Sequence, residues 1–391
     1  MKRIIQSTFG LLLLMAASET SWAAITCSPA NGSPRTDIVQ LSPPNISAGA
    51  DIPVGTVIYQ GRWYSGAIVG QSVISCASPV NTSFWLNVAW GIENAPQGLS
   101  TWAGSPFGGT VYETGIEGVG IAISQSNGGQ GATVGQPVYK YPGDYNASIE
   151  SGYYRPYLAD NNIYVSLIKI GTMRAGSYNL EAAKLPSANI TVTNPLSHPT
   201  TSSGLPIKAI IVKFQGQMAV NTQTCKTPDV NVDMGSYEKR QYFTDIDSTT
   251  PWVDASIVLT NCPAFYGFYN AANSTLMFDY STGKGLVANS TSNSVGVRLT
   301  PSTSVIDSPR GIMSTDKSSS GAALGVGIQV GWGSASGSPA LFDFATEKLF
   351  QIPKDGRTEI KIPLVARYIQ TDAMVTPGTA DGKAVFLINY Y

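Results

Sequence analysis

The chain has 391 residues, with 40 glycines, 24 prolines and only 13% charged residues. Its 24 lysines and arginines nearly balance its 25 aspartates and glutamates, so we expect no basic surface for nucleic acid. A single histidine, His198, leaves most histidine-based catalysis and zinc binding without the side chains they need. The chain is too apolar for disorder, and its length favours two domains.

The first residues are typical of an export signal. Lys2 and Arg3 form a basic start, Phe9–Ala17 is an apolar run, and Ser21–Ala23 has the small-x-small pattern of a cleavage site. An apolar run of nine residues is too short to cross a bilayer core of about 30 Å as a helix. We therefore expect residues 1–23 to be a signal peptide and the mature protein to be secreted and soluble.

After this signal, apolar and polar residues alternate with period two, and clusters of Gly, Pro, Asn and Ser separate the runs. This pattern predicts short strands, and we find no convincing helix longer than two turns. Short strands at this spacing predict an all-β chain built from two β-sandwich domains. The clearest strands are predicted at residues 54–59, 83–90, 163–170 and 207–214.

Four cysteines in an exported chain predict disulfides, and four cysteines allow three pairings. Local pairing, which we favour, joins Cys27 to Cys76 and Cys225 to Cys262, so that each domain holds one bridge. Such bridges imply an oxidising compartment.

The position of the domain boundary depends on residues 194–204, which have the composition of a linker. The predicted strand 207–214 comes after them and needs sheet partners before the third cysteine. We therefore interpret 194–204 as a long loop of the first domain. The predicted domains are 24–221 and 222–391.

The C-terminus is the most informative part of the second domain. Gly378 is fourteenth from the end, Tyr390 is penultimate, and Ala384, Phe386 and Ile388 alternate between them. With this ending, residues 222–391 resemble the pilin domain of chaperone–usher fimbriae. The other segments that carry the resemblance are 225–235, 256–263, 295–299, 326–330, 350–353 and 362–368.

This resemblance implies an immunoglobulin-like sandwich that lacks its last strand. A periplasmic pilus chaperone would fill the groove first, an outer-membrane usher would assemble the fibre, and the next fimbrial subunit would then insert its N-terminal strand. Such β-augmentation uses backbone hydrogen bonds for affinity and alternate side chains for register. The pairing edge would include Gly378, Ala384, Phe386, Ile388 and Tyr390.

The start of the chain indicates the place of the subunit in a fibre. A donating subunit needs a long alternating N-terminal extension, whereas Cys27 is the fourth residue after the expected cleavage site. We therefore expect a subunit that only accepts a strand and sits at the fimbrial tip on the cell surface. The first domain resembles type 1 and type 3 fimbrial adhesins, through Tyr112–Ile123 and Leu167–Gly176, and a lectin-like sandwich is implied. Mannose specificity is not implied, because the residues of the mannose pocket do not align.

A glycan site needs aromatic faces and short polar side chains in a small concave surface. The densest mixture lies between residues 141 and 162, and Trp102 with Phe107 is a second candidate. The competing interpretation is that these aromatic residues belong to the core. The candidate ligand-binding residues are Trp102, Tyr145, Tyr153, Tyr154, Tyr157, Asp160 and Asn161.

Two functions stay open: a receptor-binding tip adhesin for a host glycan or protein, and a non-binding cap that starts or ends the fibre. The size and the Tyr and Trp content of the first domain favour the adhesin. An enzyme is not expected, because Ser236–Lys239 and Ser314–Lys317 fit Ser-x-x-Lys without its partner motifs. His198 is interpreted as a solvated loop residue, and no cofactor or metal is expected.

Overall fold

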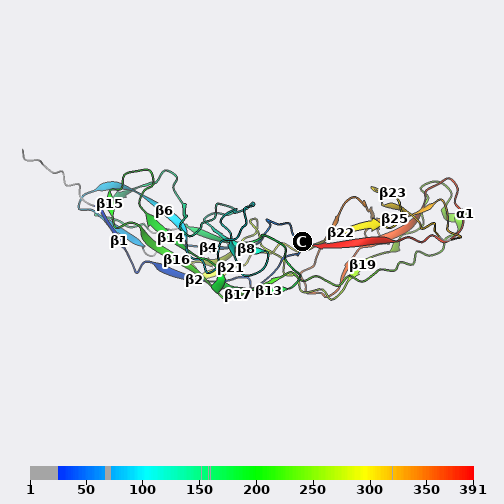
Figure 1. Ribbon diagram of the computed structural model, residues 1–391, viewed down its shortest axis with the longest axis horizontal. Coiled ribbons are helices and arrows are strands. Elements are labelled where there is room, and N and C mark those ends of the chain that lie inside the picture. The colour runs from blue at the N-terminus through cyan, green and yellow to red at the C-terminus, as the bar shows by residue number, and fades with distance from the viewer. Residues whose placement is uncertain (1–24, 67–71, 151, 157, 159, 319) are drawn as a thin grey trace, which may run out of the picture.

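Nearly all of the regular structure is β-strand, which confirms the all-β prediction. In the computed structural model the strands form two lobes along an elongated molecule (Figure 1). The structure describes residues 25–66, 72–150, 152–156, 158, 160–318 and 320–391. The predicted signal peptide therefore lies outside the described residues. Within them, helix is confined to η1 (Ala182–Lys184) and α1 (Lys239–Tyr242), and neither is long and apolar enough to cross a membrane.

The first lobe contains four sheets. One has the order β11 (Tyr153–Tyr154), β5 (Ile74–Ala77), β1 (Ile25–Pro29) and β15 (Ser202–Ser203). A second has the order β10 (Tyr145–Ile149), β6 (Thr82–Asn94), β14 (Ser187–Thr193), β16 (Ile207–Gln215) and β2 (Arg35–Gln40), with β9 (Val138–Tyr139) paired to β6. A third has the order β21 (Lys284–Leu286), β20 (Thr275–Asp279), β4 (Val57–Tyr64), β12 (Asn162–Lys169), β8 (Val119–Ser124) and β7 (Tyr112–Glu113). The smallest has the order β13 (Ser177–Glu181), β17 (Gln217–Asn221) and β3 (Asn45–Ser47).

The second lobe contains three sheets. The largest has the order β18 (Val253–Asp254), β29 (Leu364–Gln370), β25 (Val326–Trp332), β24 (Ile312–Ser314) and β23 (Val305–Asp307), with β26 (Ala340–Leu341) paired to β25. The other two are the pair β19 (Ile257–Leu259) and β28 (Ile360–Ile362), and the sheet β27 (Lys348–Gln351), β22 (Ser294–Pro301) and β30 (Ala384–Tyr390). The C-terminus lies where the two lobes meet (Figure 1).

Each lobe has its own main hydrophobic core. Trp63, Tyr59 and Phe84 are among the largest fully buried side chains of the first core, and Phe342 is the largest of the second. The four clearest predicted strands are present as β4, β6, β12 and β16. The local disulfide pairing is also confirmed, because Cys27 bonds to Cys76 and Cys225 bonds to Cys262.

The strands β20 and β21 cross between the lobes: they belong to the second half of the sequence but complete a sheet of the first lobe (Figure 1). β20 pairs in parallel with β4, with Thr275 opposite Gly61 and Asp279 opposite Tyr64. Met277 is buried in the first core. The sequence pattern did not indicate this crossing. The domain boundary near residue 221 stays a prediction. Residues after it, in β20 and β21, pack in the first lobe.

Candidate functional site

The first lobe contains a cavity of about 190 Å³ between two of its sheets. Leu86 and Val88 of β6 and Val192 of β14 supply its apolar side, since alternate residues of a strand face the same way. A concave site with apolar walls and a few polar groups is the usual form of a small-ligand pocket. The other lining residues are Lys140, Tyr141, Tyr145, Tyr154, Pro156 and Leu158.

Three tyrosines form the aromatic wall of this cavity. The rings of Tyr141 and Tyr145 stack, with centroids 5.3 Å apart and planes at 29°. Tyr154 packs its edge against the buried ring of Phe84, at 5.7 Å and 84°. Burial raises the pKa of the Tyr154 hydroxyl, and the neighbouring tyrosines add to the shift. The wall therefore offers neutral aromatic faces and hydroxyl groups, a combination that suits the apolar faces and hydroxyls of a sugar.

Lys140 is the cation of the cavity. Its ammonium donates to Asn161 Oδ1 at 3.3 Å and lies 5.5 Å from the ring centroid of Tyr141. Burial lowers the pKa of Lys140, and the nearby Asp160 carboxylate opposes this shift. A lysine ammonium has three N–H donors, so the bond to Asn161 leaves donors that could serve an acceptor group of a ligand.

The segment that carries Leu158 and Asn161 is held by the residue that follows β4. The Ser65 amide donates to Asn161 O at 2.9 Å, and Ser65 Oγ accepts from the Asn161 amide at 2.9 Å and donates to Leu158 O at 3.0 Å. The Tyr64 hydroxyl forms a short hydrogen bond with Asp160. Leu158 and Asp160 have φ angles of 46° and 57°, and such backbone persists only where the surroundings enforce it.

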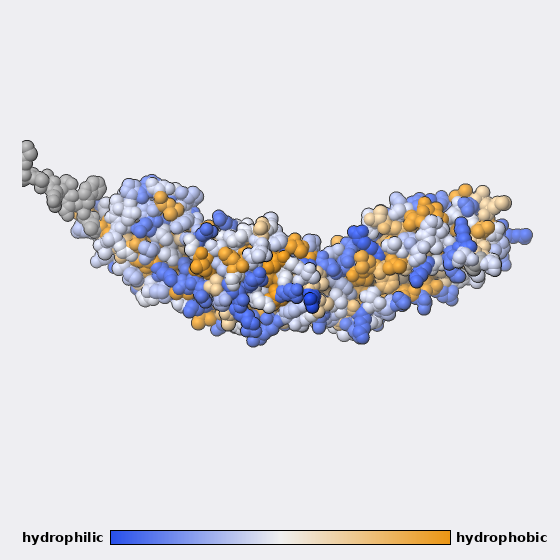
Figure 2. Space-filling view, viewed as in Figure 1, coloured by the Kyte–Doolittle hydropathy of each residue, from blue (hydrophilic) through white to orange (hydrophobic). Residues whose placement is uncertain are grey.

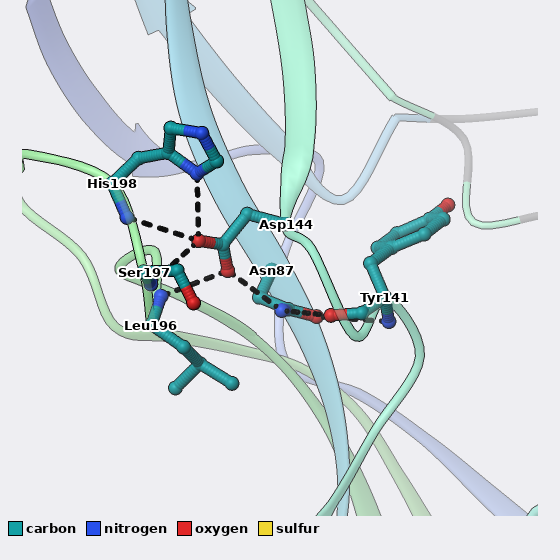
Figure 3. A network of polar contacts seen from close by, with 6 residues as sticks. All are labelled: Asn87, Tyr141, Asp144, Leu196, Ser197 and His198. Carbon is teal, nitrogen blue, oxygen red and sulfur yellow. Dashed lines mark hydrogen bonds and ion pairs between the residues drawn. The ribbon is translucent and has the colours of Figure 1, made fainter.

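Asp144 fixes the loop beside the cavity (Figure 3). Its carboxylate accepts hydrogen bonds from the amides of Leu196 and Ser197, both at 2.8 Å, and from the Asn87 side chain at 2.9 Å. Desolvation by itself raises the pKa of Asp144, but these hydrogen bonds, with one from His198, outweigh it and hold the pKa well below its ordinary value. Residues 196–198 are therefore tied to the turn that precedes β10.

His198 has a structural role that the sequence did not reveal. Its ring stacks on Trp85, with centroids 3.7 Å apart and planes at 9°, and its Nδ1 lies 3.2 Å from Asp144 Oδ2 (Figure 3). The interpretation of His198 as a solvated loop residue is wrong, because this side chain packs on an aromatic ring and contacts a buried carboxylate.

The structure brings only part of the predicted ligand residues together. Tyr145 and Tyr154 line the cavity, Asn161 holds Lys140, and Asp160 bonds to Tyr64 outside it. Tyr157 lies outside the described residues.

Two other candidates lie away from the cavity lining. Tyr153 is 53% exposed, and the Arg155 guanidinium lies 4.5 Å from its ring centroid. Trp102 donates from its indole to Pro106 O at 2.9 Å and packs on a separate small cluster with Phe107.

Sequence reasoning missed Lys140, Leu86, Val88 and Val192. Leu86 and Val88 fall in the predicted strand 83–90, but the strand pattern does not mark a ligand site, and Val192 falls in none of the clearest predicted strands. A lone lysine next to a tyrosine carries no distinctive signal.

Within the part of the chain that the structure describes, β30 pairs only with β22, which leaves an open sheet edge in the second lobe. Tyr391 and Ser294 exchange backbone hydrogen bonds, so antiparallel alternation turns the backbone groups of Ala384, Phe386 and Ile388 away from β22. The side chains of these three residues are only half-buried. Apolar residues are also visible on the surface of this lobe in Figure 2.

The opposite flank of this open edge is the segment 227–238, which belongs to no described strand. Val230 packs on the same core as Phe386 and Ile388, and Met234 packs on the same smaller cluster as Ala384. At one end, the Cys225 amide donates to the Tyr390 hydroxyl at 3.1 Å. Apolar residues of both flanks therefore pack on the same two clusters, and we call the open edge of β30 together with the segment 227–238 the acceptor groove.

A loop of the first lobe closes one end of the acceptor groove. The Asp51 amide donates to Tyr390 O at 3.0 Å, and Asp51 Oδ2 accepts from the Tyr390 amide at 2.8 Å. Gly49 passes so close that a Cβ there would lie 2.0 Å from Tyr390 O. The open part of the β30 edge therefore ends at Ile388.

Comparisons with known proteins agree with this architecture. Residues 212–391 match the family model described as "Fimbrial protein". The chain is 30% identical over 181 residues to "Fimbrial subunit type 1" of Salmonella typhimurium, an alignment that covers 46% of this chain and 81% of that protein.

Two solved structures match the chain at low similarity. The CupB6 tip adhesin of Pseudomonas aeruginosa matches with 17% identity and a TM-score of 0.32, over 94% of both chains. The receptor binding domain of the plasmid-born adhesin MrkD1P of Klebsiella pneumoniae matches with 18% identity and a TM-score of 0.30, over 52% of this chain and 99% of that one. On the family model and the curated relative, the chain belongs to the fimbrial protein family, as the residues of its second half indicated.

Proposed function

We propose that this fimbrial protein is the tip adhesin of a chaperone–usher fimbria. Its first lobe would bind a host receptor, and its second lobe would join the fibre by accepting a donor strand. The observation that carries this proposal is the acceptor groove, because an open edge with apolar flanks is a feature that soluble proteins usually cover. Export through the periplasm to the fimbrial tip at the cell surface follows from this role.

The acceptor groove supports strand donation by its chemistry. The outward backbone groups of Ala384, Phe386 and Ile388 offer donors and acceptors, and the half-buried side chains on both flanks offer places for alternate apolar residues. A periplasmic chaperone strand would occupy the groove first, and the next subunit would replace it after delivery to the outer-membrane usher.

The cavity of the first lobe supports receptor binding and favours an adhesin over a non-binding cap. A cap has no need of a concave site lined by Tyr141, Tyr145 and Tyr154. We assign a glycan as the receptor class, because the wall combines aromatic faces with hydroxyl groups. The family is one of fimbrial subunits, and we propose binding and structural roles without catalysis.

The groove is tested by removing Ala384–Tyr391 from the full chain expressed with the chaperone of its fimbria. We expect the truncated chain to be degraded in the periplasm, because the pairing strand and part of the second core are gone. Soluble truncated chain at the level of the wild type, expressed with or without the chaperone, would refute the incomplete sandwich.

The receptor role is tested by applying the chaperone-bound full chain to an array of mammalian glycans. Selective binding to one glycan class is the expected result. Binding only in a parallel screen of matrix proteins such as collagen would replace the glycan by a protein receptor. Binding in neither screen would favour the non-binding cap.

A further inference from the structure

The hairpin of the second half that enters the first lobe reaches the candidate receptor pocket through a short chain of contacts. We call residues 269–286 the arm. The arm starts at Tyr269, whose amide donates to Ile58 O at 3.4 Å and whose ring packs on Tyr59 with centroids 6.2 Å apart. It then follows β4 as β20, to Asp279 opposite Tyr64. The arm therefore runs along β4 toward the end that holds Leu158, Asp160 and Asn161. We call these three residues the pocket segment.

The arm is part of the first core. Tyr269 and Met277 are each 5% exposed and belong to that core. Met277 packs over Gly61, where a Cβ would lie 2.6 Å from its sulfur. The guanidinium of Arg35 lies 3.5 Å from the ring centroid of Tyr280. Buried packing and a cation–π contact of this kind hold a segment in one position.

The tip of the arm contacts the residues that hold the pocket segment. The Tyr280 amide donates to Tyr64 O at 3.1 Å, and Tyr64 bonds to Asp160 through its hydroxyl. Gly66 contacts both the arm and the pocket segment. Its carbonyl accepts from the Asp160 amide at 3.1 Å, and a Cβ on Gly66 would lie 2.5 Å from Ser281 Oγ of the arm.

The pocket segment needs this support. Its backbone has positive φ at Leu158 and Asp160, a conformation that persists only where the surroundings enforce it. Leu158 lines the cavity, and Asn161 accepts from the Lys140 ammonium. A shift of the Tyr64–Gly66 backbone would therefore change both a wall of the cavity and the partner of its cation.

We infer that the arm of the second half is a positioning element of the receptor pocket, so that both halves of the chain build the adhesive site. This inference rests on the proposed receptor function. It assigns Met277 and Tyr280 as positioning residues that act through Tyr64 and Ser65 on Leu158, Asp160 and Asn161, without touching the ligand.

The test uses the chaperone-bound full chain with Tyr280→Ala and, separately, Met277→Ala. Leu286→Ala is the matched control, because Leu286 lies on the same hairpin and is 72% exposed. Hydrogen exchange of the Asn161 amide, which donates to Ser65 Oγ, reports on the pocket segment. We expect this exchange to become about tenfold faster in the two arm variants, as for the loss of one stabilising contact, and to stay unchanged in the control.

The second readout is binding to the glycan array. Weaker binding by Tyr280→Ala at an unchanged melting temperature would support the inference, because a purely structural role would not change affinity per folded molecule. Unchanged Asn161 exchange in both arm variants would overturn it. If the wild-type chain binds no glycan, the receptor proposal fails, and the exchange measurement still decides whether the arm positions the segment.

Discussion

In the first lobe the outer edge of β4 is covered by β20, a strand that comes from the other half of the chain. In the second lobe no described strand pairs with the outer edge of β30 between Ala384 and Ile388. Both edges carry apolar side chains, but only the first has its partner within the same molecule. Under the proposed function, permanent cover of an edge comes from the same chain, and the edge left open is the one that exchanges partner strands.

The largest effect is expected from a charge placed in the acceptor groove. Phe386→Asp puts a carboxylate among the half-buried apolar residues of the second core, and an uncompensated charge there costs several kcal/mol. We expect loss of periplasmic protein in pulse–chase experiments. Leu387→Asp is the control, because Leu387 is 55% exposed on the opposite face and should accumulate normally. Equal accumulation of the two variants would show that the groove is not an apolar site.

A smaller effect is expected where the first lobe closes the open edge. Gly49→Ala puts a methyl group 2.0 Å from Tyr390 O, so the loop must withdraw and the Asp51–Tyr390 hydrogen bonds weaken. Overpacking of this kind costs about 1–3 kcal/mol, which urea titrations of the chaperone-bound chain can measure. In the control variant Gly98→Ala, the added methyl group meets no heavy atom within 4 Å, so the urea concentration at the unfolding midpoint should stay unchanged. A normal midpoint for Gly49→Ala would mean that this contact adds nothing to stability.

The pocket itself is expected to respond by affinity. Tyr154→Ala removes a ring that lines the cavity, and receptor affinity should fall about tenfold, equal to about 1.4 kcal/mol. Tyr153→Ala is the neighbouring control, since successive residues of β11 face opposite sides. Melting curves measured beside the binding curves separate lost affinity from lost folding. Unchanged affinity per folded molecule for Tyr154→Ala would place the receptor site elsewhere, with Trp102 as the next candidate.

The smallest effect is expected at Asp144, and it depends on pH. The pKa of its carboxyl in the folded chain lies below the unfolded value of about 3.9. The ionised carboxyl therefore stabilises the fold above about pH 4, and this contribution is lost as the pH falls through the folded-state pKa. Asp144→Asn should lower the melting temperature most near neutral pH, and the difference from the wild type should shrink toward pH 2.

The control for this prediction is Asp372→Asn, at an exposed surface position. A surface substitution of this kind should leave the melting temperature close to that of the wild type. If the difference in melting temperature between Asp144→Asn and the wild type stays constant with pH, the Asp144 side chain stabilises the fold by its packing and not by its charge.

Local features of the sequence determined the β-rich class, the strands β4, β6, β12 and β16, and the family of the second half. Alternation with period two is a property of neighbouring residues, so it survives without knowledge of the fold. The same holds for the spacing of Ala384, Phe386 and Ile388 at the C-terminus. The disulfides were predictable because each cysteine pairs with the nearest other cysteine in the sequence.

Only the tertiary structure decided which residues meet across the chain. The sequence marks Leu86 and Val88 as inward-facing, but their place in a cavity depends on Tyr154 from another sheet. It marks His198 as a loop residue, but the Trp85 ring and the Asp144 carboxylate come from distant segments. The covering of β4 by β20 was hidden for the same reason. Long-range strand pairing is selected by the shape and burial of surfaces that exist only after folding. A strand that pairs in a sheet of the other lobe has the same local sequence pattern as a strand that pairs within its own lobe.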